Sequence, residues 1–366
     1  RASERMSYRP PVRDDLAELP GYHSPQLDVE HRLNTNESPE PPPLGFQQAV
    51  VDRVAALEWN RYPDRGVTEL RTKLAAHHVA DHPGITPDNI FVANGSNEVL
   101  QTIMLAWGGP GRSILTFEPT YAMHGQIARV TGTGVIEIER QDDFTIDADH
   151  AITTLGETRP IATFLCSPNN PTGIVEPPEL VQRVLDTVSD FGLLVVDEAY
   201  AQFSDWSALD LFDEDTAMIV TRTFSKTWAM AAARLGYLIA PKWIIERLNT
   251  AILPYHLDAV SQAAGSAALD FEDEMNARVA RMVEQRGAIQ AGLGDLGIEF
   301  WPSQSNFVLF RPPNNSGNEV WQQLVDRGVL VRNCASWPRL DGCLRITVGT
   351  SDENRAFLAA LADIVS

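Results

Sequence analysis

The sequence has only three cysteines and no motif that binds a metal. Cys166, Cys334 and Cys343 cannot all pair with one another, and no Cys-x-x-Cys occurs. This usage is typical of a reducing compartment, so we expect a cytoplasmic protein with reduced cysteines. The eight histidines show neither His-Glu-x-x-His nor a comparable ligand spacing, so the sequence predicts no metal site.

Long apolar runs and an excess of positive charge are also missing. No apolar run approaches the ~20 residues that a membrane helix needs, and no signal peptide opens the sequence. The 29 Lys and Arg residues are outnumbered by 49 Asp and Glu residues, and the net charge is −20. Such an acidic surface argues against nucleic acid and anionic membranes as partners. An anionic substrate would need a local basic pocket, so isolated arginines become candidate ligands.

The 366 residues leave room for one large domain and one smaller domain. Residues 1–44 are dense in proline, which forbids regular helix, and we expect an arm there. We expect a large domain at 45–255. The rhythm of helices and strands changes after that point, which predicts a small α+β domain at 256–366.

Short apolar segments alternate with helical periods in the large domain. We expect strands at 90–93, 113–117, 134–139, 161–166, 193–196, 218–221 and 235–240. This rhythm predicts an α/β fold with a largely parallel sheet that is buried on both faces. Ligands of such sheets bind at the carboxyl ends of the strands. Polar clusters at 94–97, 169–173, 197–200 and 223–226 all follow strand ends, so we expect a binding site at that edge.

The stretch around Lys226 has the residue types that hold a carbonyl cofactor with a phosphate group. Lys226 lies between Phe224 and Trp228, whose bulk should remove water from it. Desolvation lowers the pKa of a lysine, and the neutral amine can form a Schiff base. The nearby hydroxyls and Arg234 suit a phosphate, because a guanidinium binds one through two hydrogen bonds. The stretch therefore indicates pyridoxal phosphate, although a Ser-Lys pair alone is more often a solvated surface pair.

Each of the other polar motifs has an ordinary structural explanation when it stands alone. An Asp at a strand end can cap a helix, and Gly95-Ser96-Asn97 can be a simple helix start. Asn-Pro-Thr-Gly at 170–173 favours a turn. Together they supply what pyridoxal phosphate needs: a carboxylate at the ring nitrogen, donors to the ring hydroxyl, an aromatic stacking partner and a phosphate cup.

The order of Asn170, Asp197, Tyr200, Lys226 and Arg234 resembles that of the fold-type I, class I/II aminotransferases, which depend on pyridoxal phosphate. The resemblance extends from about Arg13 to the C-terminus. It implies a large domain with a mostly parallel central sheet flanked by helices, and a smaller α+β domain. Within the group the chain is most similar to histidinol-phosphate aminotransferases, in segments at 33–37, 60–64, 253–257, 305–308, 331–333 and 342–349.

The resemblance implies a role for each cofactor residue. Lys226 would carry the cofactor as a Schiff base and move the substrate's proton, and Asp197 would pair with the ring nitrogen. Asn170 and Tyr200 would hydrogen-bond the ring hydroxyl, and Tyr121 would stack on the ring. The residues expected to hold the phosphate are Ser96, Asn97, Thr223, Ser225 and Arg234.

The resemblance also implies a homodimer with shared sites, since Tyr62 would reach the phosphate of the partner subunit's cofactor. Arg345 would bind the carboxylate of glutamate or 2-oxoglutarate, and Arg332 would bind the phosphate of histidinol phosphate. The residues expected to contact substrate are Tyr22, Asn36, Asn97, Tyr255, Arg332 and Arg345. The chain departs from the family at Asn97, where Asp is usual, and at Ala232, where glycine is common.

The implied reaction transfers an amino group between L-histidinol phosphate and 2-oxoglutarate, giving imidazole acetol phosphate and L-glutamate, in histidine biosynthesis. An aromatic amino-acid aminotransferase on the same scaffold is the first alternative. A decarboxylase of a phosphorylated amino acid shares the fold. A transcription regulator with an aminotransferase-like domain would need a helix-turn-helix domain, and the proline-rich arm does not resemble one.

Overall fold

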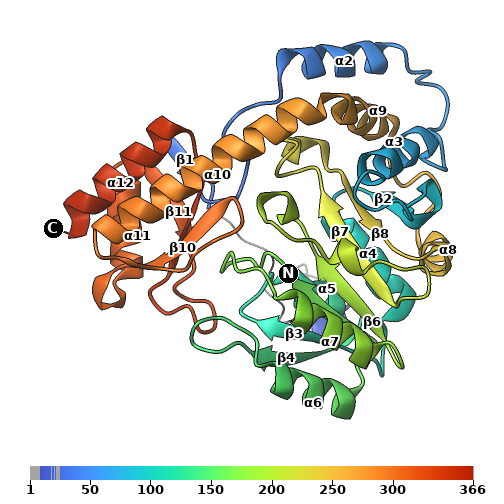
Figure 1. Cartoon of the computed structure of the whole chain (residues 1–366), viewed down its shortest axis with the longest axis horizontal. Coiled ribbons are helices and arrows are strands. Elements are labelled where there is room, and N and C mark those ends of the chain that lie inside the picture. The colour runs from blue at the N-terminus through green and yellow to red at the C-terminus, as the bar shows by residue number, and fades with distance from the viewer. Residues whose placement is uncertain (1–8, 18, 20, 22–24, 366) are drawn as a thin grey trace, which may run out of the picture.

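The computed structural model describes residues 9–17, 19, 21 and 25–365, which fold around two sheets (Figure 1). The larger sheet has seven strands in the order β2-β8-β7-β6-β5-β3-β4, and β8 is the strand that runs antiparallel to both of its neighbours. The predicted α/β fold with a mostly parallel central sheet is confirmed. The strands are β2 (Ile90–Ala93), β3 (Ser113–Glu118), β4 (Gly134–Glu139), β5 (Ala162–Cys166), β6 (Leu193–Asp197), β7 (Met218–Thr223) and β8 (Gly236–Ile239).

The large sheet is buried on both faces, which explains its nearly continuous apolar strands. Along β6, Leu194 and Val196 face one core while Leu193 and Val195 face the other, because successive side chains of a strand point in opposite directions. Helices cover both cores. They are α2 (Leu44–Ala55), α3 (Thr68–His78), α4 (Ser96–Trp107), α5 (Met123–Val130), α6 (Ala148–Thr158), α7 (Pro178–Val188), α8 (Lys242–Ala251) and α9 (Ala259–Ala268).

The smaller sheet combines the C-terminal strands with one strand from the N-terminal part of the chain. Its order is β1-β11-β12-β10-β9, and β1 runs parallel to β11 with His31 opposite Val329. Sequence analysis did not predict β1, because a three-residue strand with one fully buried side chain has no readable period. The strands are β1 (His31–Leu33), β9 (Glu299–Phe300), β10 (Phe307–Arg311), β11 (Val329–Asn333) and β12 (Leu344–Thr347).

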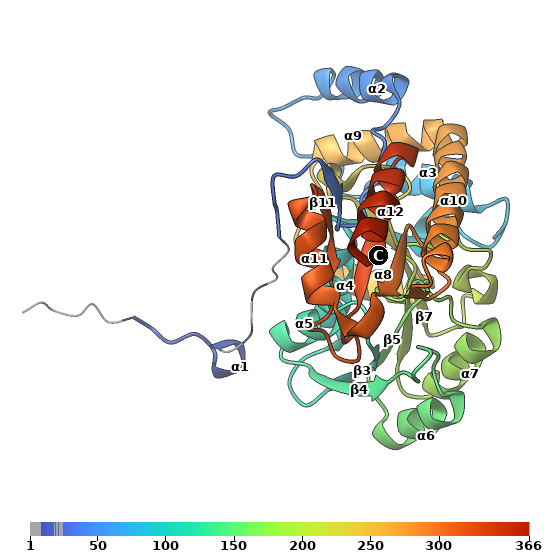
Figure 2. The ribbon, with the colours of Figure 1, turned by 90° about the vertical axis from the view of Figure 1, so that its left-hand side faces the viewer.

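Three helices cover the outer face of the small sheet (Figure 2): α10 (Glu272–Asp295), α11 (Gly317–Asp326) and α12 (Ser351–Val365). The four-residue helix α1 (Asp14–Ala17) lies beside α5, where the Arg13 guanidinium donates a hydrogen bond to the Val130 carbonyl. Short 3-10 helices complete the structure at Pro87–Asn89, Ala201–Phe203, Ala208–Leu211, Ala231–Ala233, Leu269–Phe271 and Pro313–Asn315. No helix among the described residues is both long and apolar enough to cross a membrane.

The chain passes from the large sheet to the small sheet along α10 (Figure 1). Helices α9 and α10 are separated at Leu269–Phe271, where Phe271 packs edge-on against Phe46 of α2. Helix α9 still packs on α2 and α3. Met275 belongs to the large core and Met282 to the small core. We therefore propose that the domain boundary lies within α10 rather than at residue 256.

Candidate active site

A cavity of about 700 Å³ brings together most of the residues that the sequence predicts for the site. It lies at the carboxyl edge of the parallel strands, and the small sheet supplies part of its wall. The predicted residues that line it are Asn36, Ser96, Asn97, Tyr121, Asn170, Asp197, Tyr200, Thr223, Ser225, Lys226, Arg234, Arg332 and Arg345. Tyr22 lies outside the described residues. Tyr62 and Tyr255 do not line this cavity.

Lys226 follows β7 and enters the cavity from the large sheet. Its Nζ donates a hydrogen bond to the Thr35 carbonyl at 3.2 Å. Burial lowers the pKa of Lys226 to about 8, and the positive charges of Arg345 and Arg234 act in the same direction, while Glu37 opposes them. A substantial fraction of the amine is thus neutral near pH 8, as a nucleophile or base must be.

Asp197 ends β6 at the floor of the cavity and is almost fully buried. Its Oδ2 lies 2.8 Å from Nε2 of His124, and its Oδ1 accepts a hydrogen bond from the Thr221 hydroxyl at 3.2 Å. The His124 ring stacks on Phe164 and meets Tyr121 edge-on. Sequence reasoning missed His124. The sequence signal that could have indicated it is that His124, in the first turn of α5, follows the predicted site residue Tyr121 by three positions.

Tyr200 and Asn170 lie in a network with the small sheet. The Tyr200 hydroxyl accepts a hydrogen bond from the Asn36 amide at 2.9 Å, and burial raises the pKa of Tyr200 to about 12. Tyr200 therefore keeps its proton and can donate it in a hydrogen bond. Arg345, on β12, donates to the side chain of Asn170 and to the Asn34 carbonyl, so its guanidinium is held in the cavity wall.

The start of α4 and the loop around Arg234 form a tight cup. A Cβ on Gly95 would lie 2.7 Å from a nitrogen of the Arg234 guanidinium, and a Cβ on Gly236 would lie 2.4 Å from the Ser96 nitrogen. Only glycine permits this close approach. The Thr223 hydroxyl accepts a hydrogen bond from the Ser225 N–H. Free N–H groups at a helix start, beside a guanidinium and hydroxyls, suit a phosphate.

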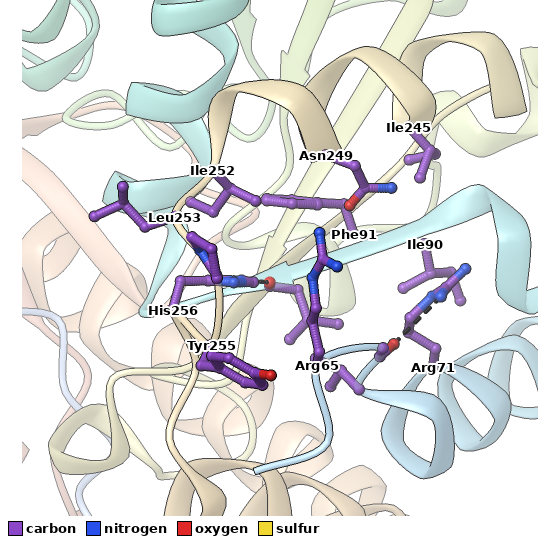
Figure 3. Close-up of a pocket in the computed structure, with 14 residues that line it drawn as sticks. Arg65, Arg71, Ile90, Phe91, Ile245, Asn249, Ile252, Leu253, Tyr255 and His256 are labelled. Carbon is purple, nitrogen blue, oxygen red and sulfur yellow. Dashed lines mark hydrogen bonds between the residues drawn. The ribbon is translucent and has the colours of Figure 1, made fainter. Parts of the chain in front are cut away.

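Tyr62 and Tyr255 lie together on the outer surface, and their rings stack with centroids 4.5 Å apart. Tyr255 was expected to contact the substrate, and it does not line the cavity that contains Lys226. The cause is the segment next to it: His256 stacks on Phe91 and its Nε2 lies 2.7 Å from the Val92 carbonyl oxygen (Figure 3). Behind Tyr255 is a separate hollow of about 380 Å³ that Arg65 enters.

The family model for aminotransferase class I and II matches residues 31–361. The chain belongs to the class I and II aminotransferase family. This family depends on pyridoxal phosphate, so the protein is a transaminase with that cofactor.

The aminotransferase is similar over nearly its whole length to proteins named histidinol-phosphate aminotransferase. It is 44% identical to the one from Rhodococcus opacus (strain B4), over 97% of this chain and 93% of the relative. It is 42% identical to the one from Corynebacterium diphtheriae, over 97% of this chain and 96% of the relative. A solved histidinol-phosphate aminotransferase from Sinorhizobium meliloti, in complex with pyridoxal-5′-phosphate, has the same fold: the TM-score is 0.88 at 24% identity, covering 98% of this chain and 99% of that chain.

The cavity of the aminotransferase fits its cofactor. The glycine cup at Gly95 and Gly236 is shaped for a phosphate, and a lysine with a lowered pKa stands in the same cavity. Asp197 offers carboxylate oxygens to a ring nitrogen. Three cavity residues that sequence reasoning did not find are Gln126 on α5, Trp337 after β11, and Glu37.

Proposed function

We propose that this aminotransferase transfers the amino group between L-histidinol phosphate and 2-oxoglutarate, giving imidazole acetol phosphate and L-glutamate, in histidine biosynthesis. The observation that carries the proposal is that Arg332 and Arg345 line one cavity together with Lys226. The relatives named for this reaction, at 42–44% identity, support the same substrate.

When bound, pyridoxal phosphate supplies an electron sink for the negative charge that forms as the substrate's Cα loses its proton. Lys226 is the residue that moves this proton, since its lowered pKa provides a neutral amine. Asp197 would accept a hydrogen bond from the ring nitrogen of the bound cofactor, and it is itself held by His124. Tyr200 and Asn170 would bind the ring oxygen, and Tyr121 would cover the ring.

The two substrates differ in the anion that the cavity must hold. Glutamate has two carboxylates, whereas histidinol phosphate has no carboxylate on Cα and carries a phosphate instead. A guanidinium fork binds both kinds of anion, so arginines can serve both halves of the reaction. In this proposal Arg345 binds the glutamate carboxylate and Arg332 binds the phosphate. Ser96, Asn97, Thr223, Ser225 and Arg234 would hold the cofactor phosphate.

The proposal includes a homodimer with shared sites. Tyr62 is 80% exposed, and it lines one surface hollow together with the exposed Trp59 and Tyr255. A surface of this kind is typical of a protein–protein contact. We infer that a second copy covers it, and that Tyr62 and the stacked Tyr255 enter the partner's cavity, Tyr62 at the phosphate and Tyr255 at the substrate. The cytoplasmic location stays a prediction.

The substrate proposal is tested with the purified protein, pyridoxal phosphate and 2-oxoglutarate. Histidinol phosphate should yield glutamate with a kcat/KM at least about 100-fold above that of phenylalanine, because phenylalanine leaves the phosphate-binding arginine without a partner. A comparable or higher rate with phenylalanine favours an aromatic amino-acid aminotransferase. Carbon dioxide release without an oxo-acid acceptor indicates a decarboxylase, and no glutamate from histidinol phosphate refutes the assignment.

A further inference from the structure

Trp337 stands beside Arg332 in the wall of the cavity. The guanidinium carbon of Arg332 lies 5.3 Å from the centroid of the Trp337 ring. Both side chains are half-buried and both line the cavity that contains Lys226. A guanidinium at this distance from an indole face is attracted by the negative face of the ring. Arg332 therefore has an aromatic neighbour that lines the same cavity.

The loop that carries Trp337 is compact. It connects β11 to β12 and closes on itself through a backbone hydrogen bond from Cys334 N–H to the Cys343 carbonyl. Inside it, Trp337 N–H donates to the Cys334 carbonyl, and Leu340 N–H donates to the Trp337 carbonyl. Trp337 also packs on a buried apolar cluster that contains Leu340 and Trp301. The backbone of Trp337 is thus held by hydrogen bonds, and its indole ring packs on the apolar cluster.

The same loop is tied to the large sheet. Arg339 forms ion pairs with Glu139, at 2.6 Å, and with Asp142, at 2.9 Å. Glu139 ends β4, so this contact joins the loop to the edge of the other sheet. These two ion pairs connect the loop that carries Trp337 to the large sheet.

We propose that Trp337 is a positioning residue that holds the Arg332 guanidinium for the phosphate of the amino donor. An arginine side chain loses considerable rotamer freedom when it binds, and a ring that restricts it beforehand reduces that loss. The inference rests on the proposed function, since it concerns the affinity for histidinol phosphate. Trp337 acts through Arg332, so it should matter little to glutamate, whose carboxylate is bound by Arg345.

The test compares Trp337→Leu and Trp337→Phe in the holoenzyme. Trp337→Leu should raise the KM for histidinol phosphate about 5- to 30-fold, the range that one cation–π contact supplies. The KM for glutamate should stay within about 2-fold, since Arg345 is unchanged. Trp337→Phe keeps an aromatic face and should restore most of the affinity.

A double-mutant cycle separates action through Arg332 from a general loss of structure. If Trp337 works only by holding Arg332, then Arg332→Ala with Trp337→Leu should raise the KM for histidinol phosphate no further than Arg332→Ala alone. Additive effects would overturn the proposal, as would equal changes in both KM values or no change in Trp337→Leu. A wild-type enzyme that does not use histidinol phosphate refutes the proposed function instead, before any variant is compared.

Trp301 provides a matched control. It packs in the same apolar cluster, and Arg311 lies 5.1 Å from its ring centroid, but it does not line the cavity. Trp301→Leu should lower the thermal stability and leave the KM for histidinol phosphate within about 2-fold of wild type. A rise in KM equal to that of Trp337→Leu would show that the cluster, and not the ring beside Arg332, determines the affinity.

Discussion

Burial and neighbouring charge determine the chemistry of Lys226. The pKa of this lysine falls from 10.5 to about 8, chiefly because its charged form loses water, and Arg345 and Arg234 add repulsion. The burial that favours the neutral amine therefore lowers the free energy of unfolding of the cofactor-free protein. Below pH 8 the folded chain must hold a poorly solvated ammonium ion.

This predicts a pH dependence of stability. Between pH 8 and pH 10.5 the unfolded Lys226 binds a proton that the folded one releases, so the free energy of unfolding should rise with pH in this window. Relative to Lys226→Met, cofactor-free wild type should gain up to about 3 kcal/mol between pH 7 and pH 10.5. Urea unfolding of both proteins at each pH gives the difference between their free energies of unfolding. The contributions of the other titrating groups cancel in this difference. A flat difference would contradict the lowered pKa.

His124 offers a second prediction at this scale. A hydrogen bond to a charged group contributes about 1.5–3 kcal/mol, so His124→Asn should weaken binding of pyridoxal phosphate roughly 10- to 100-fold. The reason is that Asp197 loses the partner at 2.8 Å that orients it toward the ring nitrogen. Equilibrium dialysis gives the dissociation constant. Thr221→Val, which removes the longer bond at 3.2 Å, is the control and should have a smaller effect.

At the scale of single elements, the side chains at the ends of β6 and β7 serve different purposes. Asp197 and Thr223 line the cavity, whereas Glu198 and Arg222 form a buried ion pair at 2.6 Å. Glu198 also accepts hydrogen bonds from the Ala208 N–H and the Ser207 hydroxyl. The pair connects the segment after β6 to β7, and so helps fix the spacing between Asp197 and Lys226.

Glu198→Gln should destabilise the protein by about 3–5 kcal/mol, because it leaves the Arg222 charge buried without a counter-charge. The double variant Glu198→Gln with Arg222→Met should recover part of this loss. Chemical denaturation of each protein measures it. Glu137→Gln breaks the exposed pair with Arg129 and should cost no more than about 1 kcal/mol. Equal losses in the buried and exposed pairs would show that burial is not the cause.

The sequence could predict Asp197 and Lys226 because parallel strands end at a common edge, and a polar cluster after each strand must meet there. His124 could not be predicted in this way, since its contact with Asp197 depends on how α5 packs on the sheet. Trp337 was equally hidden, because a loop has no period and its contact with Arg332 exists only in three dimensions. Strand β1 depends on a partner almost 300 residues away in the chain.

At the scale of the whole molecule, the stacked Tyr62 and Tyr255 lie outside the cavity of their own chain. The resemblance implies that Tyr62 reaches a partner subunit, and it leaves open which subunit's substrate Tyr255 contacts. Because the two rings stack on each other, a partner cavity that receives Tyr62 would also receive Tyr255. A sequence pattern cannot reveal whether a loop residue contacts the site of its own subunit or that of the partner subunit.

Hybrid dimers test the shared sites. Lys226→Ala and Tyr62→Ala subunits should each have low activity alone, because every dimer lacks one of the two groups in both sites. After mixing and subunit exchange, about half of the dimers are hybrids with one intact site, so activity should recover to roughly a quarter of wild type. The assay is glutamate formation before and after exchange. No recovery, with exchange verified by mass, would mean that Tyr62 serves its own chain.

The pairing of β1 with β11 affects how the protein can fold during its synthesis on the ribosome. Residues 31–33 leave the exit tunnel early, but their partner at 329–331 is made about 300 residues later. At roughly 5–20 residues per second, this segment waits on the order of 15–60 seconds with an exposed edge. During that time the large sheet, whose strands all lie between residues 90 and 239, can already fold. We therefore expect the small sheet to form after the large sheet, although its strand β1 is synthesised before every strand of the large sheet.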